Sequence, residues 1–184
     1  DVSLPPFADA LTLLDRERRI RFVTDPEAIP ESEDEEEGSD SPGRDILGEM
    51  EIAARIMITG GDEREDARMT RADRLLVRNA ILLAAKTVSR RGGDQVLTRD
   101  VVAALNAQGQ EPTLPDHRRH RATEMADGMA LFCSGLAGDF FDRPGSPWPE
   151  VDVTLVEMGV LAREGYEDQL TVAYTAMMSH INQL

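Results

Sequence analysis

The chain is almost without lysine. Of its 20 basic residues 19 are arginine, and Lys86 is the single lysine. A phosphate-binding P-loop needs Gly-x-x-x-x-Gly-Lys-Ser/Thr, because its lysine reaches the phosphates while backbone N–H groups surround them. Lys86 is followed by Thr87 but preceded by Ala85, inside a segment with helical spacing. The chain therefore holds no complete P-loop.

Cysteine, aromatic residues and long apolar runs are also scarce. The lone Cys133 excludes a disulfide within the chain and a cysteine-cluster zinc site, and it fits a reducing compartment. Aromatic residues make up 4% of the chain, so aliphatic side chains, methionine and alanine must fill the core. No apolar run approaches the ~20 residues that span a bilayer. We therefore expect no membrane span.

Basic residues are too few to balance the acids, and the formal net charge is −15. Seven of the acids lie in Glu31–Asp40, which contains no base. Like charges repel one another and this stretch has nothing apolar to bury, so residues 31–43 are expected to be a disordered acidic loop. An acidic arm that binds a basic partner is the alternative. An acidic chain suits nucleic-acid phosphates poorly, so we expect no direct contact with nucleic acid.

Helical spacing of apolar residues dominates what is present. The central helix is expected over residues 70–88, where Thr70 and Asp73 have the spacing of a capping box. Further helices are predicted over 45–59, over 99–108 with Thr98 as N-cap, from Pro115 to about Leu136, and over 169–184. Alternation predicts a short strand at Val151–Val156 and, more weakly, one at Ile20–Val23. These patterns indicate a mainly α fold, a helical bundle with one or two short strands.

The same patterns divide the chain into three parts. Residues 1–44 are expected to be an extended lead-in with a short helix near its start and the acidic loop near its end. Residues 45–150 form a helical domain, in which Gly61–Met69 is a charged connector. Residues 151–184 supply the strand and the last helix.

Two histidines are the first candidates for a metal site. His117 and His120 are three residues apart, which places both on one helix face, and Glu124 follows one turn later. Three arginines interleave them, and their positive charge opposes a bound cation. A solvated polar face is therefore the favoured interpretation, and no metal ligand is assigned.

The candidate nucleophiles, Cys133 and Ser134, have no clear pattern of a general base around them. Cys133 follows Phe132 in an apolar segment, where an inert buried thiol is the usual case. Ser134 has no convincing histidine and acid pattern around it, and His180 lies on the last helix. We assign no catalytic residue.

Three arginines form a stripe on the central helix. Arg71, Arg74 and Arg78 could contact phosphate or the carboxylates of a partner. Local pairing with acids such as Asp73 and Glu63 is favoured over either, because paired surface charge is the norm on helices.

Five segments occur in an order that is itself informative. They are MTRADRLLVRNAILLAA, VLTRDVVAALNA, RATEMADGMALFCSGLAGDFFDRPG, VDVTLVEMGVL and EDQLTVAYTAMMSHINQL, with a weaker match back through ILGEMEIAARIMITGG. In order and spacing they resemble the large ATPases of conjugative type IV secretion systems, the TraC class. The resemblance covers roughly Asp45 to Leu184. In that family these segments form a largely helical portion set into a RecA-like ATPase, between Walker A and Walker B.

The resemblance implies a fragment of a bacterial DNA-transfer ATPase. The chain begins at Asp1 rather than methionine, and it lacks both the P-loop lysine and an apolar strand ending in Asp-Glu. ATP and Mg are implied for the intact parent, none for this chain. Implied partners are the ATPase core, neighbouring subunits of a homo-oligomer and other secretion proteins, in the cytoplasm at the inner-membrane face. The alternative is a free-standing helical interaction or regulatory module with an acidic arm.

Overall fold

The computed structural model describes residues 3–15, 45–145, 153 and 155–181. In chain order the helices are η1 (Ala8–Leu11), α2 (Ile46–Thr59), α3 (Glu63–Arg68), α4 (Arg71–Arg90), α5 (Thr98–Gly109), α6 (Asp116–Ala130), η2 (Leu131–Cys133), α7 (Gly135–Phe141) and α8 (Glu167–Ile181). No strand occurs within the described ranges. The fold is mainly α, a helical bundle, as the spacing of apolar residues predicts.

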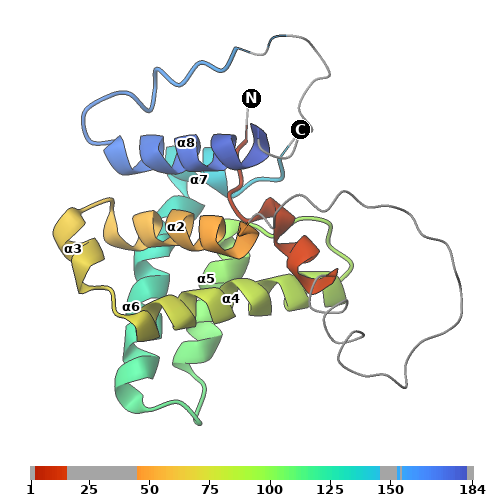
Figure 1. Ribbon diagram of the computed structural model, residues 1–184, viewed down its shortest axis with the longest axis vertical. Coiled ribbons are helices and arrows are strands. Elements are labelled where there is room, and N and C mark those ends of the chain that lie inside the picture. The colour runs from red at the N-terminus through yellow and green to blue at the C-terminus, as the bar shows by residue number, and fades with distance from the viewer. Residues whose placement is uncertain (1–2, 16–44, 146–152, 154, 182–184) are drawn as a thin grey trace, which may run out of the picture.

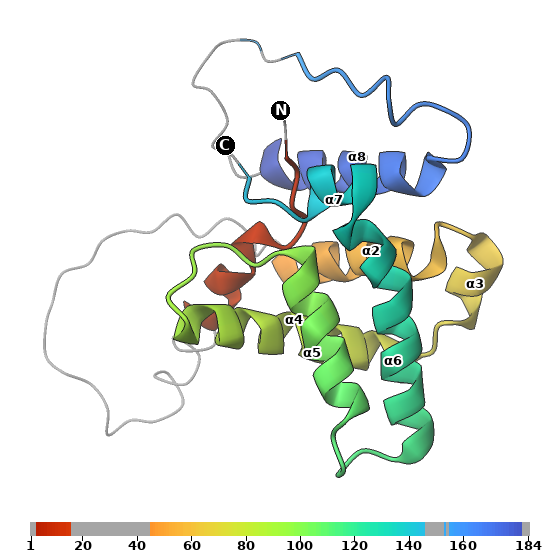
Figure 2. The same ribbon diagram turned by 180° about the vertical axis from the view of Figure 1, so that it is seen from behind.

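The helices form two crossing layers. Figure 1 shows α8, α2 and α4 side by side with nearly parallel axes, α2 running opposite to the other two, and α5 and α6 cross behind them. The reverse view places α5 and α6 in front, next to each other (Figure 2). The core between the layers is mostly aliphatic and is centred on Met57, Ile81, Leu105, Met125 and Met129, all almost fully buried.

Helix α4 contacts η1, α2, α5 and α6. Its first turn is closed by the predicted capping box: the Asp73 N–H donates to Thr70 Oγ1 at 3.2 Å, and the Thr70 N–H donates to Asp73 Oδ2 at 2.9 Å. Its buried face consists of Leu76, Val77, Ala80, Ile81, Ala84, Ala85 and Val88. Leu75, which helical spacing also places on an apolar face, is 50% exposed.

Glycine allows α6 to cross close to α2. A Cβ added at Gly128 would lie 2.9 Å from the carbonyl oxygen of Ile58. Any larger residue would push the two backbones apart. Helix α2 ends just beyond this crossing at Gly60, whose φ of 62° is left-handed, and the Gly60–Gly61 pair predicts that end correctly.

The first described residues are joined to the end of α7. The Leu4 N–H donates to the Phe140 carbonyl at 2.7 Å, and the Ser3 hydroxyl donates to the Arg143 carbonyl at 2.8 Å. Leu4 and Phe7 are buried in the common core. Residues 3–15 therefore belong to the bundle, and part of this stretch is helical, as expected near the start of the chain.

The single helix expected from Pro115 to about Leu136 is wrong. Helix α6 ends at Ala130, and α7 begins only at Gly135. Between them Ser134 is extended and Gly135 has a φ of 60°, a conformation that favours glycine. A Cβ at Gly138 would lie 2.8 Å from the Cys133 carbonyl oxygen, so α7 folds back tightly on the turn before it.

The expected N-cap at Thr98 is also wrong. Thr98 lies inside the first turn of α5, is fully buried and donates its hydroxyl hydrogen to the Phe141 carbonyl at 2.7 Å. The first turn is closed instead by Asp100, whose Oδ2 accepts the Leu97 N–H at 2.9 Å. The Thr98 hydroxyl, which the local sequence assigns to the N-cap of α5, is therefore bonded to α7 instead.

The charged connector at Gly61–Met69 contains a helix, α3. Asp62 precedes it and accepts the N–H groups of Arg64 and Glu65 at 2.8 and 3.0 Å. None of its residues is buried, so apolar spacing gives no sign of it. The feature of the sequence that indicates this helix is its N-cap residue, Asp62.

The strand predicted at Val151–Val156 is not formed where it is described. Val153, Leu155 and Val156 have no strand pairing. A strand needs a neighbouring strand for its backbone hydrogen bonds, and the described part of the chain offers none. Ile20–Val23 and the acidic residues 31–43 lie outside the described residues.

Candidate functional site

The lysine and threonine of the rejected phosphate loop lie within α4. The Thr87 hydroxyl donates to the Leu83 carbonyl one turn earlier, at 2.8 Å. Lys86 is part of the same regular helix. The backbone N–H groups around both residues are bonded within the helix, so they cannot surround a phosphate.

The two histidines lie on an exposed face of α6. His120 Nε2 is 3.2 Å from Glu124 Oε1, and the side chains are 78% and 48% exposed. His117 is exposed in the first turn. No group of three or more histidine, cysteine, aspartate or glutamate side chains in the described ranges is arranged to hold a metal ion. The histidines form a solvated polar face here.

Cys133 is half-buried at the end of η2. Burial raises the pKa of its thiol to about 11, and the nearby negative charge of Asp142 acts in the same direction. The protonated thiol is a weak nucleophile. Ser134 beside it is exposed, and His180 belongs to α8 with its side chain outside the described part of the chain.

The arginine stripe pairs with an acid, but not with the acids expected. Arg78 Nε is hydrogen-bonded to Glu51 of α2, and Arg74 Nε lies 3.9 Å from the same carboxylate. The hydrogen bond to Glu51 raises the pKa of Arg78. Glu51 is 5% exposed, so a nearly buried charge is neutralised from the surface of α4. Within the described residues Arg71 has no ion-pair partner.

Asp142 forms the most extensive polar junction, one that local sequence patterns miss. It is 2% exposed and accepts the Arg99 backbone N–H and Nε–H, each at 2.8 Å. Arg99 Nη2 also donates to the Asp142 carbonyl at 2.6 Å. Burial raises the pKa of Asp142, whereas Arg99 opposes that shift. The junction closes the first turn of α5 with a residue from the end of α7.

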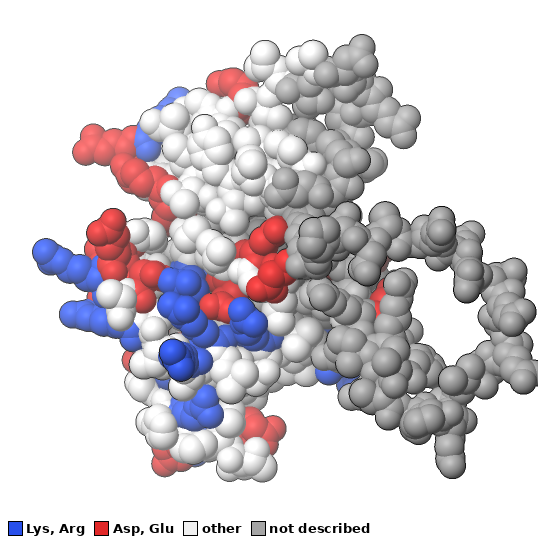
Figure 3. Space-filling model, in the orientation of Figure 1, with Lys and Arg blue, Asp and Glu red and all other residues white. Residues whose placement is uncertain are grey.

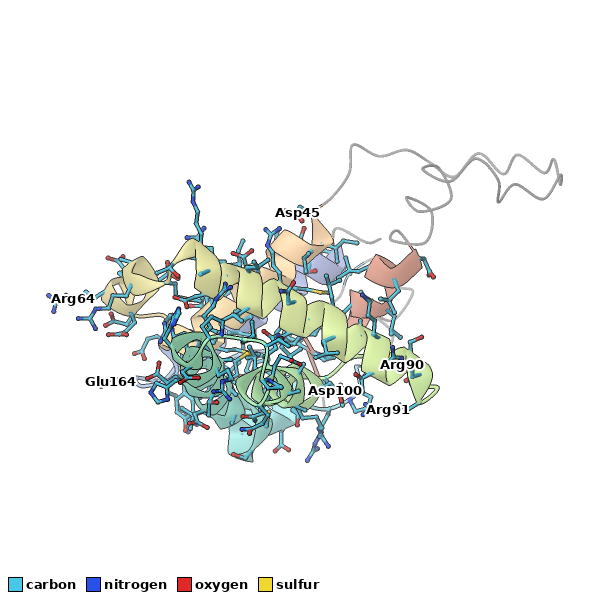
Figure 4. All side chains as sticks on the ribbon, turned by 90° about the horizontal axis from the view of Figure 1, so that it is seen from below. Asp45, Arg64, Arg90, Arg91, Asp100 and Glu164 are labelled. Atoms are coloured by element: carbon cyan, nitrogen blue, oxygen red, sulfur yellow. The ribbon has the colours of Figure 1, made fainter. Side chains whose placement is uncertain are left out.

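A second ion pair stands beside this junction. Arg91, just after α4, donates through Nη2 to Asp100 Oδ1 at 2.9 Å. Figure 4 shows the two labelled residues close together at that end of α4. Asp100 is 9% exposed and already closes the first turn of α5. Both carboxylates at this end of α5 therefore have structural partners.

A cleft of about 640 Å³ opens where α3, the start of α4 and the start of α6 meet. It is lined by Glu65, Arg68, Thr70, Ala72, Asp73, Leu76, His117, Arg118 and Arg121. Its volume lies within the ~300–1,000 Å³ of ordinary ligand sites. In Figure 3 blue arginine side chains gather over this part of the surface, although the chain as a whole is acidic. We call this feature the arginine cleft.

The opposite end of the molecule presents apolar side chains. Tyr174, Met178 and Ile181 follow one another at helical spacing on α8 and are 51%, 52% and 46% exposed. Val153 and Leu155, in the segment before α8, are 80% and 88% exposed. Most of the surface over α8 in Figure 3 carries neither charge colour. We call these five residues the apolar face.

Comparisons with known proteins found no match that bears on the function of the chain. No family model matches the chain, no curated protein matches it, and no solved structure matches its fold. Within the described residues no helix has the length and apolar character needed to cross a membrane.

Proposed function

We propose that this chain is the helical portion of a conjugative type IV secretion ATPase of the TraC class. Its role would be mechanical: it covers the nucleotide domain, contacts neighbouring subunits of a homo-oligomer or other secretion proteins, and moves with ATP turnover. The site of action would be the cytoplasmic side of the inner membrane of a bacterium that transfers DNA.

The apolar face is the observation that carries this proposal. Exposed apolar side chains are normal singly, but several on one face of a helix indicate a surface that another protein part covers. Here three lie on one face of α8, and two more lie in the preceding segment, in which alternation predicts a strand. The described residues of that segment have no strand pairing, which is what a strand of a larger sheet would show when its neighbouring strands are not part of the chain.

The proposed role requires no catalysis by this chain. Lys86 lies within α4, so the described residues provide no phosphate loop for ATP and no step of hydrolysis can be derived from them. ATP and Mg belong, in this proposal, to the parent domain. The order of the five family-like segments supplies the assignment to the conjugative class.

The encoding gene gives the direct test. We expect a Gly-Lys-Ser/Thr loop upstream of Asp1 and an apolar strand ending in Asp-Glu downstream of Leu184. A start codon near Asp1 together with a stop codon after Leu184 would overturn the proposal.

Hydrolysis by the purified chain gives an independent test. We expect no release of phosphate from Mg-ATP above the rate without protein, because the residues that hold and activate the nucleotide lie elsewhere in the parent. Turnover that persists through further purification and is lost in the Lys86→Ala variant would contradict the proposal.

A free-standing interaction module is the second candidate. It is favoured by the extent of the core, which residues from α2, α4, α5, α6, α7 and α8 share with the first described residues. A bundle that closes its own core can fold without a parent. In that case the apolar face would bind a separate protein.

A further inference from the structure

Two sets of arginines in the described chain differ in the acids with which they pair. Arg78, Arg91 and Arg99 each pair with a nearly buried carboxylate, on Glu51, Asp100 and Asp142, whose side chains are 6%, 8% and 3% exposed. Those pairs join helices together, and each guanidinium neutralises an acid that is almost out of contact with solvent. The arginines of the arginine cleft have weaker attachments.

Arg118 and Arg68 are the two with the most capacity left. Arg118 Nη2 makes a long contact of 3.4 Å with the Ala72 carbonyl, a neutral acceptor. Arg68 pairs only with Glu65 of its own short helix, where both side chains are more than half exposed. An exposed pair of this kind contributes little, on the order of 0–1 kcal/mol, so a better acceptor can replace it.

Arg121 has a different place in the cleft. Its Nε is 3.4 Å from Asp73 Oδ1, and its Nη1 is 3.1 Å from Glu124 Oε2. Asp73 is also part of the capping box of α4. Arg121 thus ties the start of α4 to α6 and is neutralised by two acids, while Arg68 and Arg118 line the same cleft with donors to spare.

We propose that the arginine cleft binds an acidic segment of a partner protein, with carboxylates on Arg68 and Arg118. Guanidinium groups match carboxylates through two parallel N–H···O bonds. Leu76 and Ala72 give the cleft an apolar wall on which the CH₂ groups of a glutamate can pack. The inference stands on this geometry alone and applies equally to a free-standing module.

Phosphate groups fit the cleft less well. Asp73 and Glu65 are among its lining residues and would repel a phosphate, whose charge is higher than that of one carboxylate. The capping box engages the N–H groups of Thr70 and Asp73, so two of the donors at the start of α4 are not available to phosphate oxygens. Spaced carboxylates can avoid the two acids, whereas a nucleic-acid backbone cannot.

The experiment is an anisotropy titration of the whole chain against a fluorescent peptide of alternating glutamate and alanine. The variants Arg68→Glu and Arg118→Glu are each expected to weaken binding about tenfold, because a favourable charge contact becomes a repulsion. Arg64→Glu is the matched control: it makes the same charge change on α3, but its side chain projects away from the body (Figure 4). A peptide with glutamine in place of glutamate should not bind.

A second variant removes the acidic residues of the chain itself that could compete with the peptide for the arginine cleft. In it the seven acids of Glu31–Asp40 are replaced by glutamine and asparagine. Absence of glutamate-peptide binding to both proteins would overturn the inference, as would equal weakening by Arg64→Glu. Binding of a single-stranded oligonucleotide or of inorganic phosphate more tightly than the peptide would overturn it in favour of a phosphate site. Circular dichroism of each variant shows whether the fold is kept.

Discussion

The two ends of the molecule are held by different kinds of interaction. Around the start of α4, hydrogen-bonded caps and ion pairs fix the helices, with Glu51, Asp73 and Arg121 each bonded across helices or within a cap. Around α8, the contacts are apolar: Val172, Ala173 and Ala176 are buried against the bundle. Directional bonds specify one geometry, whereas small apolar side chains specify only that water is excluded.

This difference indicates that the two ends contribute differently to binding: the charged end to the choice of partner and the apolar end to contact area. The charged end carries donors that can distinguish one partner from another by charge and spacing. The apolar end offers area without such selection, which suits permanent contact with a larger body. The proposed anchoring through the apolar face and the inferred recognition through the arginine cleft follow this division.

The largest expected effect comes from a charge placed under α8. Val172→Asp puts an unpaired carboxylate at a position that is 0% exposed. The expected loss in the free energy of unfolding is about 3–5 kcal/mol, since a buried charge without a partner is costly. Urea denaturation measures the loss, and hydrogen exchange locates it in α8. Thr171→Asp, one residue earlier and exposed, is the control; an equal loss there would break the comparison.

Removing an ion pair at the charged end should cost less. Arg78→Met leaves the nearly buried Glu51 carboxylate with Arg74 alone, at 3.9 Å. We expect a loss of roughly 2 kcal/mol, because Arg78 is itself partly exposed and some of its charge effect is screened. Urea denaturation beside Arg71→Met gives the measurement. If both variants lose the same small amount, the pair does not hold α2 to α4.

The Asp142 junction predicts a pH-dependent difference. Its folded-state pKa is raised above the usual 3.8, so this carboxyl contributes stability that is present below pH 3.8 and lost as pH rises through the folded pKa. Asp142→Asn removes that dependence. The free energy of unfolding of Asp142→Asn relative to the unmodified protein should therefore rise from acid to neutral pH. A difference that falls over that range would show that Arg99 outweighs burial.

The smallest effect concerns the reactivity of Cys133, without any change in stability. With a thiol pKa of about 11, only a small fraction is thiolate near neutral pH. Alkylation by iodoacetamide should therefore be slower than that of free cysteine, and its rate should keep rising through alkaline pH. A rate that levels off below pH ~9, near the ordinary pKa of a cysteine, would contradict the burial of this thiol.

Short-range signals made most of the fold predictable. The capping box at Thr70 and Asp73, the glycine stop after Thr59 and the apolar spacing along α4 act within a few residues, so they can be recognised in the sequence. The break before Gly135 could not be found in this way, because apolar spacing continues across it. Only the fold of α7 back onto η2 requires the left-handed glycine.

The polar contacts were less accessible, because they join distant parts of the chain. Glu51 and Arg78 are 27 residues apart, and Thr98 and Phe141 are 43 apart. Helix spacing identifies the arginine stripe but cannot say which acid on another helix will face it. Helix spacing does not predict the arginine cleft for the same reason, since the walls of the cleft come from three helices.

The bonds between the first described residues and the end of α7 have a consequence for how such a bundle could be accommodated in a longer chain. Leu4 and Ser3 are hydrogen-bonded to Phe140 and Arg143, so the first described residues meet the end of α7, and α8 continues the bundle beyond that point. Closing a loop costs entropy that grows only slowly with its length. Here the folding of the elements from η1 to α7 brings these two points of the chain together. A longer chain could therefore enter and leave this part of the bundle at neighbouring points on its surface.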